Sequence, residues 1–190
     1  MVVALALLAA GCAAFGGAEG PPPTYDLSAA EQFPRGLRAP RGQLVIPDAT
    51  AVGALDSDKI VVRPAEGEVA ALADAQWVER LPRLVQARAV QSFENARRIR
   101  AVGRPGDRIA ADYQLLLDIR AFEIAVNGPV AEVVIAAKIV GDSSGRIIAG
   151  RVFTARVPTG ATQGAPAVAA LDEAWRKVVT DIVLWTGRII

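Results

Sequence analysis

The chain has 190 residues, of which 52% are hydrophobic, so it can bury a substantial core and is not expected to be disordered. Its 21 basic and 20 acidic residues give a net charge of +1, which gives no reason to expect nucleic acid or a strongly acidic partner. The chain contains no histidine, which excludes Ser-His and Cys-His nucleophilic pairs, histidine metal ligands and imidazole acid–base catalysis.

The N-terminal residues have the pattern of a bacterial lipoprotein signal. The only cysteine, Cys12, follows Leu8-Ala9-Ala10-Gly11 at the end of an uncharged apolar segment, and no Lys or Arg precedes that segment. Signal segments end in an apolar run followed by small residues. We therefore expect a signal peptide over residues 1–11, attachment of a diacylglyceryl group to the Cys12 thiol, and cleavage before Cys12.

Two other interpretations of this segment are weaker. Cys12 as an ordinary buried thiol would need a core element around it, but Gly16-Gly17 and three successive prolines at 21–23 follow. A transmembrane anchor over 1–18 barely reaches the roughly 20 apolar residues that a span requires. Residues 12–23 are therefore expected to be a lipid-anchored linker rich in Gly, Ala and Pro, and residues 24–190 to be one folded domain.

Short strands and one helix are expected in the first half of the domain. The strands are Tyr25-Asp26-Leu27, Leu44-Val45-Ile46 and 59–63, with a loop over 28–42. Residues 69–72 fit either a hairpin strand or the start of a helix. A helix is expected over 82–95, with 74–81 as a turn or kinked extension. Its apolar residues recur every four positions: Trp77, Leu81, Val85, Ala89 and Phe93.

A cluster of arginines follows this helix, at positions 97, 98, 100, 104 and 108. It is compatible with contact to anionic headgroups or to a partner. We prefer a solvated strand and turn, because charged residues mostly face water.

The second half predicts an antiparallel meander and a final helix. Residues 112–125 alternate, and the next strand does the same; the inward side chains are Tyr113, Leu115, Leu117, Ile119 and Ala121, then Val133, Ile135, Ala137 and Ile139. Turns at 127–129 and 141–145 lead to a third strand over 147–157.

The final helix has a single apolar stripe formed by Val168, Leu171, Trp175, Val178, Ile182 and Trp185. The stripe fits either a coiled-coil partner or the sheet of the same domain, and we favour the sheet because the meander needs a cover. The predicted fold class is α+β: a single domain with a mainly antiparallel sheet and two main helices packed on one face.

Few residues suggest chemistry. The stretch 141–145, Gly-Asp-Ser-Ser-Gly, matches the G-x-S-x-G pattern of a nucleophile elbow, but its flanks are strands and no histidine is present, so a hairpin turn is favoured. Asp56 and Asp58 are weak candidates for binding a cation, and a local turn is the simpler explanation. Asp118 and Glu123 fall on a strand. We predict no catalytic, cofactor-binding or metal-binding residue, and lipidation of Cys12 as the only modified position.

Several segments together resemble a known family. They are, after the lipoprotein signal, Tyr25-Asp26-Leu27, Asp56-Ser57-Asp58-Lys59-Ile60-Val61-Val62-Arg63-Pro64, Ala75-Gln76-Trp77 leading into Leu81-Pro82, Ala111-Asp112-Tyr113-Gln114-Leu115, and Asp118-Ile119-Arg120-Ala121-Phe122. In this order and spacing they are similar to the ABC-type transport auxiliary lipoproteins. These are the PqiC-like component of MCE-type intermembrane lipid or cholesterol transport systems. The resemblance covers nearly all of the mature chain.

The resemblance implies a non-enzymatic outer-membrane lipoprotein that faces the periplasm. Its expected partners are an MCE-domain protein with the associated ABC permease and ATPase, and the membrane through the N-terminal lipid, with no nucleic acid. A homo-oligomer is left open. Ala13 after the lipidated cysteine is compatible with sorting to the outer membrane. The alternative function is a lipoprotein that itself binds and carries a lipid, which requires an apolar cavity of at least a few hundred Å³. An assembly or secretion lipoprotein is a third hypothesis.

Overall fold

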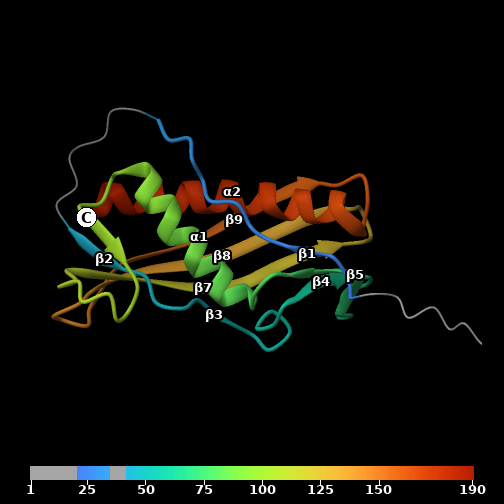
Figure 1. Ribbon diagram of the computed structural model, residues 1–190, viewed down its shortest axis with the longest axis horizontal. Coiled ribbons are helices and arrows are strands. Elements are labelled where there is room, and N and C mark those ends of the chain that lie inside the picture. Colours follow the sequence, from blue (N-terminus) through green and yellow to red (C-terminus); the bar gives the residue numbers. More distant parts are fainter. Residues whose placement is uncertain (1–20, 35–41) are drawn as a thin grey trace, which may run out of the picture.

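A nine-stranded sheet covered on one face by two helices forms the domain in the computed structural model, which describes residues 21–34 and 42–190 (Figure 1). The short strands are β1 Thr24–Tyr25, β2 Gln43–Val45, β3 Thr50–Ala51, β4 Lys59–Arg63 and β6 Ala101–Gly103; the longer ones are β5 Ala70–Trp77, β7 Tyr113–Ala125, β8 Val130–Gly141 and β9 Ile147–Pro158. The helices are α1 Leu81–Ala96 and α2 Gly164–Ile189. The α+β class predicted from the sequence is confirmed.

Strands β7, β8 and β9 form the predicted antiparallel meander. The inward side chains of β8 that alternation predicted, from Val133 to Ile139, have 0% of their surface exposed. The short strands β2, β3 and β4 pair with β7 in parallel, so the sheet is mixed at its margins and antiparallel where its strands are long. Strand β9 pairs only with β8 and is therefore an edge of the sheet within the described residues.

One face assignment in β7 is wrong. A β-bulge falls between Ile119 and Ala121, so the alternation shifts by one residue there. Beyond the bulge Phe122 and Ile124 are buried in the core, at 1% and 0% exposure. Ala121 pairs with Val134 on the opposite face of the sheet. Alternation alone cannot show a bulge, because the extra residue reverses the side-chain pattern only downstream of it.

The segment before α1 is a strand, which settles the ambiguity at 69–72 and corrects the turn or helical extension expected at 74–81. Residues 70–77 form β5, which pairs antiparallel with β4. Trp77 thus belongs to the sheet, and its ring packs edge-on against Phe122 with the ring centroids 5.7 Å apart. Its four-residue spacing to Leu81 was a coincidence of two adjoining elements.

Both helices lie on the same face of the sheet, as predicted (Figure 1). Helix α1 buries Leu81, Val85, Ala89 and Phe93, while Pro82 stands in its first turn, where a missing N–H costs nothing. Helix α2 buries its stripe against β8 and β9. Trp175 is completely buried, and its indole N–H donates to the Ser28 carbonyl at 2.9 Å. Neither helix of the described residues is long and apolar enough to cross a membrane.

The domain has two distinct ends. The described chain begins at Pro21, beside the end of the sheet where β7 turns into β8 and α2 starts (Figure 1). At the opposite end lie the β8–β9 turn, strands β2 and β6, and the C-terminus of α2. Strand β7 has 13 residues, so about 40 Å separates the two ends. We name them the tether end and the distal end.

Candidate functional site

The one residue predicted to carry a modification lies outside the described residues. Cys12 and the rest of segment 1–20 are not placed, so its lipidation and the boundary at residue 11 stay predictions. What the structure places is the domain that follows, beginning at Pro21 at the tether end.

The G-x-S-x-G stretch is the hairpin turn that was favoured. It joins β8 to β9, and the Gly145 N–H donates to the Gly141 carbonyl at 2.8 Å. The Ser144 hydroxyl bonds locally to the Gly141 carbonyl at 3.4 Å. Ser143, at the position that a nucleophile would occupy, is exposed in this turn between two strands. The strand–turn–helix context of an elbow is therefore not formed.

The acidic candidates do not converge. Asp56 pairs with Arg80 at 2.6 Å, and Asp58 lies 3.7 Å from the Lys59 ammonium. Both lie in the segment between β3 and β4, where Ser57 bonds to the Ala54 carbonyl, as expected for a turn. Residues 21–34 and 42–190 contain no group of three or more potential metal-ligating side chains.

Glu123 belongs to a row of charges across the tether half of the sheet. Arg63 donates to it through two nitrogens, at 2.6 and 2.8 Å, and the neighbouring strands contribute Glu132 and Arg156, paired at 2.7 Å. The hydrogen bonds and charge of Glu123 hold the pKa of Arg63 above its ordinary value. These groups satisfy one another, which indicates a structural role rather than an open site.

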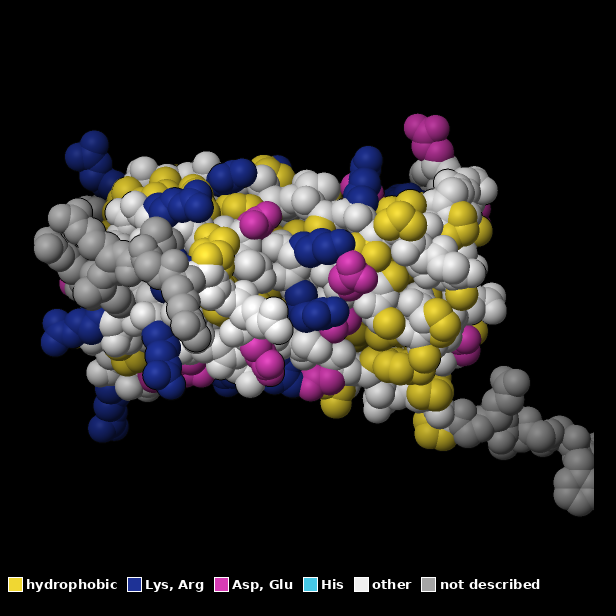
Figure 2. Space-filling model, turned by 90° about the horizontal axis from the view of Figure 1, so that it is seen from above, with side chains coloured by type: hydrophobic (Ala, Val, Ile, Leu, Met, Phe, Trp, Pro, Cys, Tyr) yellow, Lys and Arg dark blue, Asp and Glu magenta, His cyan; other side chains and the backbone are white. Residues whose placement is uncertain are grey.

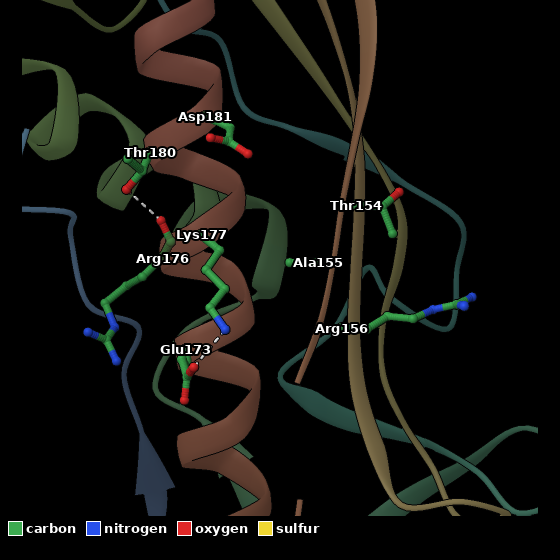
Figure 3. A pocket seen from close by; sticks show the side chains of 8 residues that line it. All are labelled: Thr154, Ala155, Arg156, Glu173, Arg176, Lys177, Thr180 and Asp181. Carbon is green, nitrogen blue, oxygen red and sulfur yellow. Dashed lines mark hydrogen bonds and ion pairs between the residues drawn. The ribbon is translucent and has the colours of Figure 1, made fainter. Parts of the chain in front are cut away.

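A groove of about 700 Å³ runs between β9 and α2 (Figure 3). Figure 3 shows Ala155 facing α2, whereas Thr154 and Arg156 point away from it. Lys177 pairs with Glu173 at 2.7 Å and holds the pKa of that carboxyl below its ordinary value. Every basic group of the groove has a carboxylate partner: Arg156 with Glu132, Arg176 with Asp172, and Lys177 with Glu173. The basic side chains of the groove are therefore neutralised by carboxylates, and Asp181 is a further acidic group in its lining.

Three further hollows, of about 360, 490 and 560 Å³, are also lined in part by charged side chains. The space between the sheet and α2 is instead filled by buried apolar side chains such as Ile135, Leu171 and Val179. All four hollows are open to solvent and include charged side chains, whereas a carried acyl chain needs an enclosed apolar cavity.

Ion pairs neutralise the basic side chains over most of the described surface. The paired residues are Lys59, Arg63, Arg80, Arg83, Arg88, Arg120, Arg156, Arg176 and Lys177. The exposed basic side chains that form no ion pair within the described residues all lie in the distal half. They are Arg97, Arg100, Arg104, Arg108, Lys138, Arg146, Arg151 and Arg188, and we name them the basic end.

The fold brings these residues together from distant parts of the chain. Arg97 ends α1 in the left-handed conformation, with φ 50°, and the chain turns from there into β6. Strand β6 pairs with β2, which pairs with the first residues of β7. Tyr113 at the start of β7 pairs with Gly141 at the end of β8, whose N–H bonds to the Arg146 carbonyl. Figure 2 shows Lys and Arg side chains projecting from this end.

The solvated strand and turn preferred for the arginines is correct in outline, because β6 and its flanking turns carry four of them at the surface. Arg98 is the exception. It is 7% exposed, its guanidinium donates to the Pro34 carbonyl, and its Cβ and Cδ lie against Gly187. Sequence reasoning missed Lys138, Arg146, Arg151 and Arg188, because no local cluster marks them and only the strand register places them beside the others.

Large apolar side chains are exposed at the same end. Leu116, Val152 and Ile147 are 39%, 46% and 62% exposed, and Ile148 and Ile189 lie near them on β9 and at the end of α2. Apolar residues mixed with arginine are the composition of protein–protein interfaces, in which lysine and acidic residues are depleted. Four exposed carboxylates, Glu94, Asp107, Asp112 and Asp142, lie at this end as well, so it is a mixed apolar and charged surface with an excess of basic side chains.

These features define a small α+β domain that offers a binding surface and no reactive centre among its described residues. Residues 25–183 match the family described as the ABC-type transport auxiliary lipoprotein component, and the chain belongs to this family. The resemblance stated from the sequence is thereby confirmed. The family consists of lipoproteins that assist transport and is not a family of enzymes.

Similar proteins support the assignment. The chain is 36% identical over 172 residues, or 90% of its length, to an uncharacterized protein of Bradyrhizobium diazoefficiens, and it spans about half (46%) of that relative. The crystal structure of a Xanthomonas campestris protein is similar with a TM-score of 0.81 and 29% identity, over 88% of this chain and 96% of the other. An uncharacterized protein with a TM-score of 0.68, 12% identity and coverages of 86% and 97% shows the same fold.

Proposed function

We propose that this chain is a non-catalytic outer-membrane lipoprotein, anchored through Cys12 and facing the periplasm, that serves an MCE-type lipid transport system. Its domain docks an MCE-domain protein or the associated ABC permease. Family membership supports the transport role, and the sequence pattern around Cys12 supports the anchor.

One structural observation carries the docking part of the proposal. The described chain starts at the tether end, whereas the basic end, with its exposed apolar side chains, lies about 40 Å away at the other end of the same domain. A lipid at Cys12 would therefore hold one end near a membrane and leave the docking surface accessible. At roughly 3.3 Å per residue, the nine residue steps from Cys12 to Pro21 span at most about 30 Å, so the tether end would stay within that distance of the lipidated cysteine.

The carrier hypothesis has less support. A carried acyl chain needs an enclosed apolar cavity, whereas the 700 Å³ groove is open and lined by ion pairs.

The test is purification of the tagged chain from its native membranes in mild detergent. Wild type is expected to recover an MCE-domain protein, and Arg104→Glu with Arg108→Glu is expected to lose it. Both arginines are exposed in the β6–β7 connection and form no ion pair within the described residues.

The matched control is Arg83→Glu with Arg120→Glu. It changes the net charge equally at exposed positions away from the basic end, and recovery should persist. Isolation of the wild type without any transporter component, but with a stoichiometric lipid, would contradict the docking role and favour the carrier.

A further inference from the structure

The first half of β9 is an unusual surface for an edge strand. From Ile147 to Val152 every residue is exposed except Ala149, which is partly exposed, whereas the second half buries alternate residues against α2. Strand β9 pairs with β8 on one side only within the described residues. An edge of this kind presents unpaired N–H and C=O groups that can hydrogen-bond an added strand.

Basic side chains lie on both faces of this half-strand. Arg151 lies on the α2 side, opposite Ala137, and its guanidinium sits 5.1 Å from the centroid of the Phe153 ring. The Phe153 ring in turn packs edge-on against Trp185 at 5.5 Å. The aromatic pair positions the Arg151 guanidinium without neutralising its charge. The Arg151 side chain therefore loses little conformational entropy when an anion binds.

Lys138 provides a charge on the other face. It pairs with Gly150 of β9, and its Cγ would lie 3.6 Å from a Cβ built on that glycine. Because Gly150 has no side chain, the Lys138 stem passes beside the β9 backbone near the free edge. Val152 and Leu116 are exposed on the same face and add apolar surface next to the charge.

Symmetric pairing with the β9 edge of a second copy of this chain does not suit the edge. Two β9 edges in antiparallel contact would bring Arg146 and Arg151 of one copy near those of the other, and like charges across a strand pair are unfavourable. Like charges of this kind are one device by which edge strands avoid pairing with themselves.

The remaining segments of the chain do not suit it either. Segment 35–41 carries three arginines and no acidic residue, and segment 1–20 has Glu19 as its only charged residue. Neither segment offers complementary charge, and we therefore seek the occupant in another protein.

We infer that the free edge of β9, from Ile147 to Val152, binds an extended acidic segment of a partner protein by strand addition. The backbone of the segment would extend the sheet, its carboxylates would meet Arg151 and Lys138, and its apolar side chains would pack beside Val152. This inference rests on the proposed function, since it names the surface and the kind of segment through which a transporter component docks.

The direct test uses the full chain purified from membranes and a nine-residue, end-blocked peptide in which pairs of glutamates are separated by single valines, so that an added strand carries carboxylates on both faces. The peptide is expected to bind, more weakly as salt is raised, and to slow amide hydrogen exchange at residues 147–152. Arg151→Glu should weaken binding at least about tenfold, because it places like charges in contact. Lys138→Glu is a second reversal that leaves the contact between Arg151 and Phe153 intact.

Arg83→Glu is the matched control and should bind like wild type, since Arg83 is exposed on α1 away from this edge. Equal binding of the same peptide with lysine in place of glutamate, or protection outside 147–152, would overturn the inference. Hydrogen exchange of the chain in anionic phosphatidylglycerol vesicles, compared with zwitterionic phosphatidylcholine vesicles, tests whether lipid headgroups bind the edge instead. Protection of 147–152 in phosphatidylglycerol alone, without peptide binding, would assign the edge to lipid headgroups and overturn it as well.

Two outcomes separate this inference from the proposed function. If Arg151→Glu and Lys138→Glu recover transporter components from native membranes as well as wild type does, the edge is not the docking site although the proposed function stands. If the wild type recovers none while the peptide still binds at 147–152, the proposed function fails and the preference of the edge for acidic strands stands.

Discussion

At the scale of single residues, a basic side chain that lies close to a carboxylate forms an ion pair and has a structural role. A basic side chain without such a neighbour keeps its charge available for binding a partner. Glu173 and Lys177 lie one helical turn apart on the exposed side of α2, in the order that favours an ion pair. Arg151, by contrast, is positioned by the Phe153 ring and keeps its charge available for binding. A basic side chain therefore serves one purpose or the other, according to whether a carboxylate or an aromatic ring lies beside it.

The Glu173–Lys177 pair gives a prediction about pH. Because Lys177 lowers the pKa of Glu173 in the folded state, the pair adds stability above the ordinary carboxyl pKa and loses it as pH falls through the folded pKa. Carboxyl NMR should show Glu173 titrating below its ordinary range. Lys177→Gln should return the titration to that range, and high salt should reduce the difference. An unchanged Glu173 titration in Lys177→Gln would contradict the pairing.

At the scale of elements, α2 contributes most of the cover over the meander. Its stripe packs on β8 and β9, and the buried stretch from Ala167 to Val183 continues for more than four turns. Trp175 lies at the centre of this contact and also ties α2 to the segment after β1 through Ser28. The helix thereby connects the first residues of the domain to its last strands.

Replacement of Trp175 is therefore expected to be severe. Trp175→Ala should lower the free energy of unfolding by about 3–5 kcal/mol, because it opens a large cavity and leaves the Ser28 carbonyl without its donor. Urea denaturation of the purified protein measures this loss. Trp185→Ala is the control from the same stripe. Trp185 is only partly buried, against Phe153, so we expect about 1–2 kcal/mol. An equal loss of unfolding free energy in the two variants would contradict the deeper burial of Trp175.

At the scale of the whole molecule, the basic side chains without an ion-pair partner are unevenly distributed over the surface. The net charge of +1 suggests an electrostatically neutral protein, but nine basic side chains over the rest of the domain are paired with carboxylates. The exposed basic side chains without a carboxylate partner gather at the distal end. The expectation from overall charge, that nothing favours an acidic partner, therefore does not extend to this one surface.

The anchor proposed at Cys12 predicts that the protein is found in the membrane fraction. Cys12→Ser should abolish acylation, because the lipid needs the thiol, and should release the chain from the membrane fraction. Intact-mass measurement of the wild type from its native host should show a chain that starts at Cys12 and carries the diacylglyceryl group. A chain in those membranes that still starts at Met1 would contradict the lipoprotein anchor.

The sequence by itself determined the fold class, the meander and the two covering helices. Periodicity over more than ten residues, as in 130–141 and 164–189, is a local signal that needs no knowledge of neighbours. The sequence also carried the resemblance to the family, through short segments in a set order.

Only the tertiary structure decided the rest. The β7 bulge and strand β5 depend on pairing with other strands, so periodicity misassigned Ala121 and Trp77. The basic end depends on register as well, because Arg97, Lys138, Arg151 and Arg188 are far apart in the chain and are brought to one end by strand pairing and by the packing of α2. Whether a charge is neutralised is a property of distance in space, and a sequence shows distance only along the chain.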